Sequence, residues 1–263
     1  MFQFCSLYSG SSGNSLLIKT PNTKILIDAG ESAKKIESAL SEIGVDINDI
    51  DAILVTHEHS DHVKGLSTIS KKFNIPVYAN KETWDAMPQI LEKVKEENQN
   101  KFNINEKFDI GELKIIPFSI PHDAANPCGF NICYKNKKIS IATDLGHMNS
   151  YLLNSLKESS FILLEANYDP NILKCSRYPY YLKQRISGPN GHLSNESAAK
   201  TISYLLNEGL QNVMLGHLSN ENNFPELAYK TVIDELCKQN FNENNLKLSV
   251  ASRNKPTSII EIQ

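Results

Sequence analysis

The feature that most constrains the fold of this chain is a run of histidines and acids placed directly after an apolar stretch. The run His57-Glu58-His59-Ser60-Asp61-His62 follows the strand-length stretch DAILVT. In an extended turn, side chains two positions apart point the same way, so His57 and His59 can hold one ion. Asp61 and His62 lie where a helix begins and point to a second position. Imidazole and carboxylate together suit Zn²⁺, Mn²⁺ or Fe.

Three further metal-capable residues stand alone at the ends of apolar runs. His122 follows IIPFSIP, Asp144 follows KISIAT, and His217 follows NVMLG. Taken singly, an Asp at a strand end is also typical of a turn or a helix cap, and a lone His is typical of a surface. Together with the 57–62 run they predict a two-metal site, because such a site needs ligands from convergent strand ends.

The order of apolar and amphipathic segments predicts an α/β fold. Each half of the chain has β-rich runs followed by βα units, which indicates two sheets packed face to face with helices outside. Helical spacing covers 31–44, 63–73, 81–100, 195–209 and 226–239. No linker rich in Pro, Gly or Ser divides the chain, so we predict one domain over residues 1–263. We expect the polar stretch 95–107 to be a loop.

Composition excludes several classes of protein. No apolar stretch reaches the roughly 18 residues of a membrane helix, and the first residues do not read as a secretory signal, so we expect a cytoplasmic protein with no membrane partner. The five cysteines form no CxxC pair, which argues against a disulfide framework and against zinc held by cysteine. The net charge of −3 does not by itself favour nucleic acid, but two divalent ions would offset it.

The hexapeptide GHLSNE occurs twice, at Gly191–Glu196 and Gly216–Glu221. The second copy follows the apolar run NVML, which makes His217 a strand-end ligand. The first copy leaves the loop ISGPN and enters a helix with Ser194 as its N-cap, so no strand presents His192 to an ion. We expect His192 beside the leaving group, where it stabilises or protonates the departing oxygen.

The order HxHxDH, then His, Asp and His, resembles the metallo-β-lactamase superfamily, and the match spans nearly the whole chain. The resemblance implies a four-layer αββα sandwich that holds two divalent ions, either Zn, Mn or Fe. One ion would be held by His57, His59 and His122. The other would be held by Asp61, His62 and His217, with Asp144 between the two. Asp28, which ends the strand TKILID, would support the histidines from behind, although a simple turn also places an Asp there.

Finer motifs resemble one branch of that superfamily. Asp144 occupies the position where β-lactamases carry Cys, which argues against drug hydrolysis. The motifs SGSSGN, PHD, TDLG, EANYD and YPYYLKQRISGPNGHLSN are similar to those of the small YycJ/WalJ group of bacterial proteins. This resemblance implies a 5′-to-3′ exonuclease activity on DNA. Two metal ions lower the pKa of a bridging water and supply hydroxide, which suits a phosphodiester. We expect His192 and Asp61 to be essential for turnover.

Several residues are candidates for contact with substrate. The segment 174–185 contains three tyrosines and no acid, and its cations are Lys174, Arg177, Lys183 and Arg185. Cations can contact phosphates and tyrosines can stack on unpaired bases, but the same composition suits a solvated connector. The loop Ser9–Asn14 offers Ser11, Ser12 and Asn14 to an anion, or forms a tight turn. Asn167 and Tyr168 follow another apolar run and can line the pocket, whereas His147 is expected at the surface.

Two other functions remain open on the sequence alone. The same fold and metals suit a lactonase, a thioesterase or a cyclic-nucleotide phosphodiesterase. A metal-binding regulatory protein without catalysis is the second alternative. The native metal, the choice between DNA and RNA, and the oligomeric state are not readable from the residues, because His and Asp ligands accept several metals.

Overall fold

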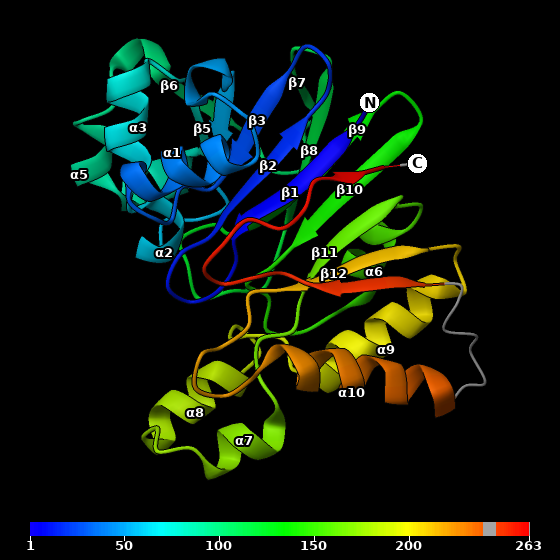
Figure 1. Ribbon diagram of the computed structural model, residues 1–263. Coiled ribbons are helices and arrows are strands. Elements are labelled where there is room, and N and C mark those ends of the chain that lie inside the picture. The colour runs from blue at the N-terminus through cyan, green and yellow to red at the C-terminus, as the bar shows by residue number, and fades with distance from the viewer. Residues whose placement is uncertain (239–245, 263) are drawn as a thin grey trace. The chain divides into compact units, whose positions relative to one another are not determined.

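A computed structural model describes residues 1–238 and 246–262 of the chain. The chain divides into two compact units. Unit 1 comprises Met1–Ser119, Ala124–Asn136 and Ser252–Gln263, and unit 2 comprises Ile120–Asp123 and Lys137–Ala251. The single domain expected over residues 1–263 stays a prediction. The segments are coloured along the chain in Figure 1.

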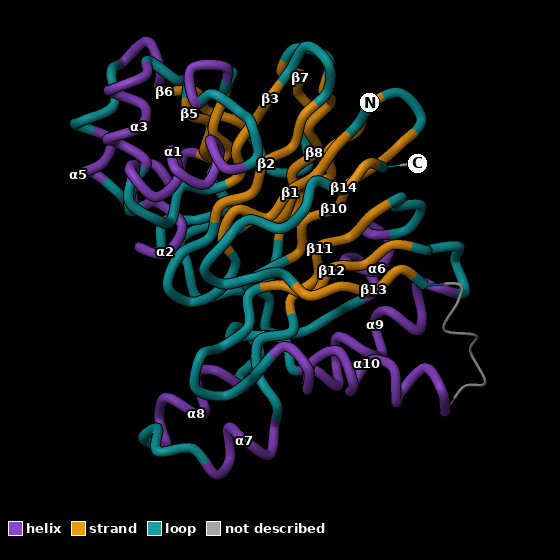
Figure 2. The backbone as a smooth tube through the Cα atoms, in the orientation of Figure 1, coloured by secondary structure: helices purple, strands orange, loops and turns teal. Residues whose placement is uncertain are grey.

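Unit 1 is built on a mixed sheet whose central strands are buried. Its strands are β1 (Gln3–Tyr8), β2 (Ser15–Lys19), β3 (Lys24–Ile27), β4 (Ala52–Leu54), β5 (Val77–Asn80), β6 (Gln99–Phe102) and β14 (Ile260–Glu261). The pairs β14–β1, β1–β2 and β2–β3 are antiparallel, and the strands from β3 to β6 run parallel. Figure 2 shows β1, β2 and β3 side by side. The carboxyl ends of β3 and β4 therefore meet at one edge of the sheet.

Helices cover one face of this sheet because their apolar residues repeat at helical spacing. They are α1 (Ala33–Glu42), α2 (Ser60–Val63), α3 (Leu66–Phe73), α4 (Lys81–Ala86) and α5 (Pro88–Leu91), with short 3₁₀ turns at Ile47–Asp49 and Glu96–Asn98. In α1, Ile36, Ala39 and Leu40 are buried at spacings of three and four. They join one apolar cluster with residues of the sheet such as Leu26 and Ile53. This packing fixes the turns that follow β3 and β4.

An antiparallel meander of three strands covers part of the sheet through aromatic contacts. It consists of β7 (Phe108–Ile110), β8 (Leu113–Ser119) and β9 (Cys128–Tyr134). The ring of Phe108 stacks on Tyr78 at 5.7 Å and on Phe102 at 5.4 Å between centroids. Offset aromatic pairs at this separation stabilise the contact beyond the area that they bury.

The loop expected over 95–107 is partly wrong, because Gln99–Phe102 forms strand β6. The sequence QNKF contains one apolar residue and shows no alternation, so periodicity gives no strand signal. The segment is held instead by pairing with β5, from Val77 opposite Gln99 to Asn80 opposite Phe102. Tertiary pairing has overridden local preference at the edge of the sheet.

Unit 2 has four parallel strands and five helices among its described residues. The strands are β10 (Lys137–Ala142), β11 (Phe161–Glu165), β12 (Asn212–Gly216) and β13 (Lys247–Val250), paired in that order. The helices are α6 (Ser150–Leu156), α7 (Pro170–Cys175), α8 (Tyr180–Ser187), α9 (Asn195–Leu206) and α10 (Pro225–Lys238). Parallel strands buried on both faces read as continuous apolar runs, as FILL does in β11.

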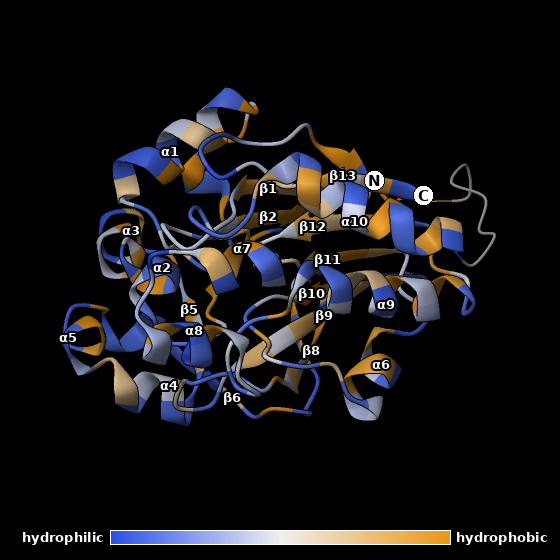
Figure 3. Cartoon of the chain, turned by 90° about the horizontal axis from the view of Figure 1, so that it is seen from below, coloured by the Kyte–Doolittle hydropathy of each residue, from blue (hydrophilic) through white to orange (hydrophobic). Residues whose placement is uncertain are grey.

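Most elements of unit 2 agree with the sequence prediction. Helix α9 begins after Ser194, whose hydroxyl accepts a hydrogen bond from the N–H of Ser197 at 3.2 Å, so the expected N-cap is confirmed. Helix α10 begins at Pro225, one residue before the helical spacing expected over 226–239, and residue 239 lies outside the described residues. Figure 3 shows hydrophilic and hydrophobic residues alternating around α10. Within 1–238 and 246–262, no helix has both the length and the apolarity that a membrane span requires.

Candidate functional site

In unit 1, the histidine run occupies the turn after β4 and the first three residues of α2. His57 follows β4 after two residues, and His59 is the extended N-cap residue of α2. The Nε2 atom of His57 lies 3.1 Å from the Nδ1 atom of His59. These two nitrogens face a common point, as the spacing of two residues predicts. His57 and His62 are fully buried, whereas the side chain of Asp61 is about a fifth exposed, at 22%.

A buried carboxylate fixes the orientation of these rings. Asp28 lies directly after β3, and its Oδ2 atom accepts from the Nδ1 of His62 at 2.7 Å and from the hydroxyl of Thr56 at 2.8 Å. Because the hydroxyl of Thr56 donates its hydrogen bond to Asp28, its oxygen is left to accept from the Nδ1 of His57 at 3.0 Å. Both rings therefore carry their proton on Nδ1 and leave Nε2 as the ligand atom. This arrangement agrees with the role expected of Asp28, which is to support the histidines from behind.

Two neighbouring segments hold the start of α2 in place. The backbone N–H of Asn14 donates to the carbonyl of Asp61 at 2.8 Å. The side-chain nitrogen Nδ2 of Asn14 lies 3.1 Å from Nε2 of His62. A Cβ atom at Gly30 would come within 1.7 Å of the same Asp61 carbonyl, so only glycine fits there. Close backbone packing, and not the helix alone, fixes the position of Asp61 and His62.

In unit 2, three adjacent parallel strands end in metal-capable side chains. Asp144 lies two residues beyond β10, Glu165 is the last residue of β11, and His217 directly follows β12. Asp144 and His217 have φ angles of 57° and 53°, in the left-handed region. Such a conformation costs about 1 kcal/mol or more for a residue other than glycine. The same conformation at Asp28 (φ 62°) makes backbone strain common to the strand ends of both units.

Glu165 lies at the centre of this cluster, and the sequence reading missed it. It is fully buried, and its Oε1 accepts from Nδ1 of His217 at 2.7 Å and Nδ1 of His192 at 2.9 Å. Its Oε2 accepts from the N–H groups of Leu145 at 3.0 Å and Leu193 at 2.9 Å. Its place at the end of the apolar run FILL was the available signal, the same one that singled out Asp144 and His217.

The surroundings of Glu165 keep it ionised. Burial alone would raise the pKa of this carboxyl, but the charges and hydrogen bonds of His192 and His217 outweigh burial and hold the pKa well below its usual range. An ionised carboxylate accepts from both imidazoles, so the proton of each ring lies on Nδ1. Both histidines of the repeated hexapeptide thus present Nε2 away from Glu165.

His122 completes the cluster in unit 2. Its Nδ1 donates to the carbonyl of Gly191 at 3.0 Å, and its Nε2 lies 3.8 Å from Oδ1 of Asp144. Burial lowers the pKa of His122 against the opposing attraction of Asp144, which favours the neutral ring that a metal needs. The ring of His192 lies 5.2 Å from the rings of both His122 and His217.

The side chains of unit 2 supply donor types that suit a divalent metal ion, with Glu165 behind His192 and His217. Ligand atoms of Asp144, Glu165, His192 and His217 all lie within 4.8 Å of one another. Neutral imidazole with carboxylate suits Zn²⁺, Mn²⁺ or Fe, and hydrogen bonds from Nδ1 to a carboxylate are typical of metal-ligating histidines. In unit 1, His57, His59, Asp61 and His62 supply the same donor types.

The comparison with known families decides the class of this protein. The model of the β-lactamase superfamily domain matches residues 23–217. The chain belongs to this superfamily. Exodeoxyribonuclease YycJ of Bacillus anthracis is 36% identical, and exodeoxyribonuclease WalJ of Streptococcus pneumoniae is 39% identical. The match covers 90% of this chain with both, and 90% and 89% of the two relatives. The resemblance inferred from the motifs is confirmed.

The solved structures confirm the fold class. The metallo-β-lactamase fold protein YhfI from Bacillus subtilis superposes with a TM-score of 0.71 at 13% identity, over 97% of this chain and 99% of that chain. The α/β sandwich of the metallo-β-lactamase type is therefore the fold of this superfamily member. The predicted class of metallo-hydrolase is confirmed by the family model and the two exodeoxyribonuclease relatives.

The candidates for substrate contact in this β-lactamase-superfamily chain have different surroundings. Ser11 and Ser12 are exposed in a turn closed by Gly13 N–H donating to the carbonyl of Gly10 at 3.0 Å, while Asn14 is buried. The side-chain amide of Asn167 donates to the carbonyl of His217 at 2.8 Å, and Tyr168 is buried. A direct substrate contact by these residues stays a prediction, as it does for Lys174, Arg177, Lys183 and Arg185. His147 is exposed, as expected.

Proposed function

We propose that this protein is a dinuclear metal-dependent phosphodiesterase that degrades DNA from the 5′ end. The support for DNA is the identity of 36% and 39% to two exodeoxyribonucleases over nine-tenths of the chain. The 5′-to-3′ direction comes from the resemblance of the motifs to the YycJ/WalJ group. The expected cytoplasmic location agrees with a DNA substrate and stays a prediction.

We propose that the ligands follow the superfamily pattern. His57, His59 and His122 hold one ion, Asp61, His62 and His217 hold the other, and Asp144 is shared. In support, His57 and His62 each have Nδ1 engaged by Thr56 or Asp28, which leaves Nε2 as the ligand atom. Two divalent ions, when bound, lower the pKa of a water molecule and neutralise phosphate oxygens.

His192 acts as the general acid in this proposal. Its side chain is 22% exposed, so it is open to solvent and substrate, and Glu165 accepts from its Nδ1 at 2.9 Å. A proton on Nε2 would give the ring a positive charge that the ionised Glu165 stabilises. That proton can pass to the departing oxygen of the phosphodiester, which would otherwise leave as a poor alkoxide.

One observation carries the proposal: Glu165 binds the histidines of both GHLSNE copies through the same oxygen atom. A single buried carboxylate thereby orients a ligand, His217, and an acid, His192. Metal binding alone would not need the second of these contacts. The arrangement favours an enzyme over a metal-binding regulatory protein.

The test is an assay with purified protein stripped of metal and reloaded with Zn²⁺ or Mn²⁺. Single-stranded and duplex DNA and RNA, each labelled at one end, are followed together with a lactone, a thioester and a cyclic nucleotide. We expect release of mononucleotides from a 5′-labelled DNA strand, and a metal content of two ions per chain. Turnover of the small substrates with every polynucleotide left intact would overturn the proposal in favour of a small-molecule hydrolase. Bound metal with no turnover of any substrate would favour the regulatory alternative.

A further inference from the structure

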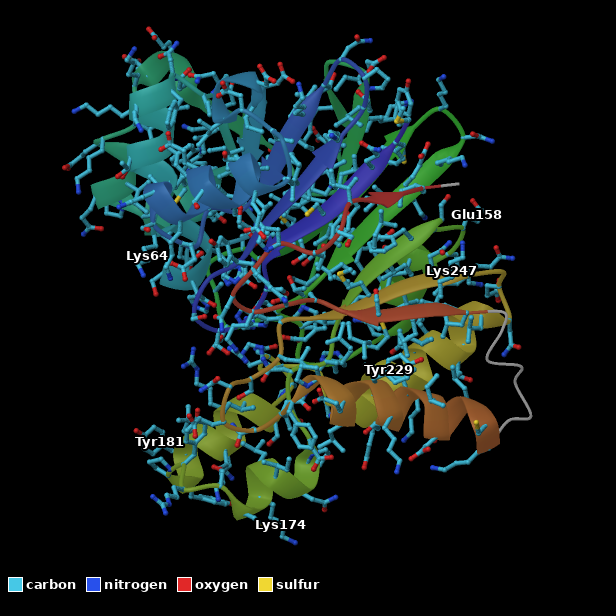
Figure 4. All side chains as sticks on the ribbon, viewed as in Figure 1. Lys64, Glu158, Lys174, Tyr181, Tyr229 and Lys247 are labelled. Atoms are coloured by element: carbon cyan, nitrogen blue, oxygen red, sulfur yellow. The ribbon has the colours of Figure 1, made fainter. Side chains whose placement is uncertain are left out.

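Helices α7 and α8 of unit 2 form a hairpin, residues 170–187, that carries two strongly exposed aromatic rings. Tyr180 and Tyr181 are 75% and 72% exposed. In the described helix α8, no side chain is buried. The half-buried side chains of α8 include Leu182 and Ile186, four residues apart on one face, whereas the two tyrosine rings project into solvent. The rings gain little stability from packing, so packing does not explain them. Figure 4 shows Tyr181 and Lys174 on this hairpin, away from Tyr229 on α10.

The cations of the hairpin divide into two groups. Lys183 donates to the carbonyls of Lys174 and Ser176, each at 2.7 Å, and so ties α8 to the end of α7. Arg185 forms an ion pair with Asp123 at 2.5 Å. The side chains of Lys174 and Arg177 are exposed, and they have no acidic partner among the described residues. Lys183 and Arg185 are therefore engaged in contacts within the protein, whereas Lys174 and Arg177 are available to a ligand.

The hairpin is joined directly to the catalytic cluster of unit 2. Asp123, the partner of Arg185, is the neighbour of His122 in the chain. The N–H of His192 donates to the carbonyl of Ile186 at 2.8 Å. A Cβ atom at Gly191 would come within 2.2 Å of the carbonyls of Arg185 and Ile186, so the loop to His192 packs closely on the end of α8. A ligand on α8 therefore lies next to the segments that position His122 and His192.

We propose that Tyr180 and Tyr181 form a stacking platform for the unpaired bases of a single DNA strand whose end lies at the catalytic cluster. This proposal rests on the proposed nuclease function and names the form of its substrate. Aromatic rings stack on any base, so the platform holds a strand without reading its sequence. Lys174 and Arg177 lie on the same hairpin and match the charge of the phosphate backbone. The hydroxyl of Tyr180 accepts from the side-chain amide of Gln184 at 2.9 Å, which restrains its ring.

Charge favours a nucleic acid over a protein partner on this surface. The segment 174–185 contains no acid, and it leaves the cations Lys174 and Arg177 exposed. The two apolar side chains of α8, Leu182 and Ile186, are half-buried and not exposed beside the rings. A protein interface would pair exposed aromatic residues with apolar neighbours at its centre. Duplex DNA hides its base faces by stacking, so the rings can select a single strand over a duplex.

The test is binding of a fluorescent DNA strand of about 12 nucleotides, the length of a typical single-strand site, measured by anisotropy with EDTA present to prevent cleavage. Tyr180→Ala/Tyr181→Ala should raise the Kd for single-stranded DNA by about tenfold or more, because each lost stack costs about this factor. Tyr180→Phe/Tyr181→Phe should restore binding, because stacking needs the ring and not the hydroxyl. Tyr229→Ala is the matched control: it removes a tyrosine that is 42% exposed on α10 and should not change the Kd.

The outcomes separate the inference from the function on which it rests. If the wild-type protein degrades DNA and the double Ala variant binds the strand as tightly as wild type, the platform is overturned and the nuclease function stands. An equal loss for duplex and single strand, or no recovery with Phe, also overturns stacking. If the wild-type protein neither binds nor cleaves any nucleic acid, the proposed function fails and the inference fails with it. Alanine is a better helix former than tyrosine, so α8 should remain folded in the variant.

Discussion

The donor groups of unit 1 and unit 2 reach similar chemistry by different routes. In unit 1, four donors come from six consecutive residues, His57 to His62, at the turn from β4 to α2. In unit 2, the donors come from three strand ends and two loops that span residues 122 to 217. Local chain geometry creates the first set, while the pairing of parallel strands and the packing of two loops create the second.

The buried carboxylates that orient the two sets of donors also differ. Asp28 bonds one ring directly and reaches the other through Thr56. Glu165 bonds His192 and His217 through the same oxygen. Every donor of the first set is a proposed ligand, but the second set combines ligands with a proposed acid. A carboxylate that serves two roles couples metal binding to proton transfer, and this coupling can be broken experimentally.

The largest expected effect comes from separating ligand from acid within unit 2. His192→Ala should lower kcat by about 10²–10⁴-fold, the contribution of a general acid, with metal content unchanged. His217→Ala should lose metal as well as activity, as should Asp61→Ala in unit 1. Metal analysis and kcat are measured on the same preparations. Loss of metal in His192→Ala would show that this histidine is a ligand.

A comparison of the two supporting carboxylates gives the next effect. Glu165→Gln and Asp28→Asn should each lower metal affinity or activity by about 10–100-fold, as changes behind metal ligands do. Glu165→Gln should lower metal affinity and, at saturating metal, also kcat, because His192 loses its partner. Asp28→Asn should be rescued by excess metal. Metal titration followed by kcat at saturation distinguishes the two, and full rescue of Glu165→Gln would refute its dual role.

Backbone packing around α2 can be tested through stability. Gly30→Ala places a Cβ atom against the Asp61 carbonyl and should lower the free energy of unfolding by about 1–3 kcal/mol, the usual cost of overpacking. The midpoint of urea unfolding measures this change. Ser41→Ala, at an exposed position in α1, is the control and should leave the midpoint unchanged. An unaltered midpoint for Gly30→Ala would mean that the turn after β3 adjusts freely.

The smallest effect is a difference in thiol reactivity between the two units. Cys128 backs the histidine run, with its N–H donating to the carbonyl of Thr56 at 3.1 Å. Burial raises its pKa well above the ordinary value, so at pH 8 the thiol stays protonated and unreactive. Cys175, on α7, is exposed. A thiol reagent should modify Cys175 in the folded protein and Cys128 only after unfolding, which mass spectrometry of the peptides would show. Modification of Cys128 in the folded protein would contradict its burial behind the histidine run.

The two sets also differ in how far the sequence could predict them. The 57–62 run was readable because its side chains are neighbours in the chain and the turn after an apolar strand fixes their directions. His122, Asp144 and His217 were found by one shared signal, a metal-capable residue after an apolar run. Glu165 also follows an apolar run and was missed, because nothing in the local sequence shows that its side chain is buried and accepts four hydrogen bonds. The cations of 174–185 were equivalent in sequence, and folding commits Lys183 and Arg185 to internal contacts.

The sequence by itself determined the superfamily, because the order of its metal-capable motifs resembles that family. It also determined the α/β class, the N-cap at Ser194 and the metal-capable residues, because these depend on periodicity and short-range geometry. Tertiary structure alone decided strand β6, the central position of Glu165 and the exposure of Tyr180 and Tyr181. Each of these depends on which distant segments pair or pack, and that is a property of the whole fold. The two copies of GHLSNE show the division. Their flanks assign one histidine to a strand end and the other to a loop before a helix, but only the packing of that loop against the paired strands brings both rings to one carboxylate.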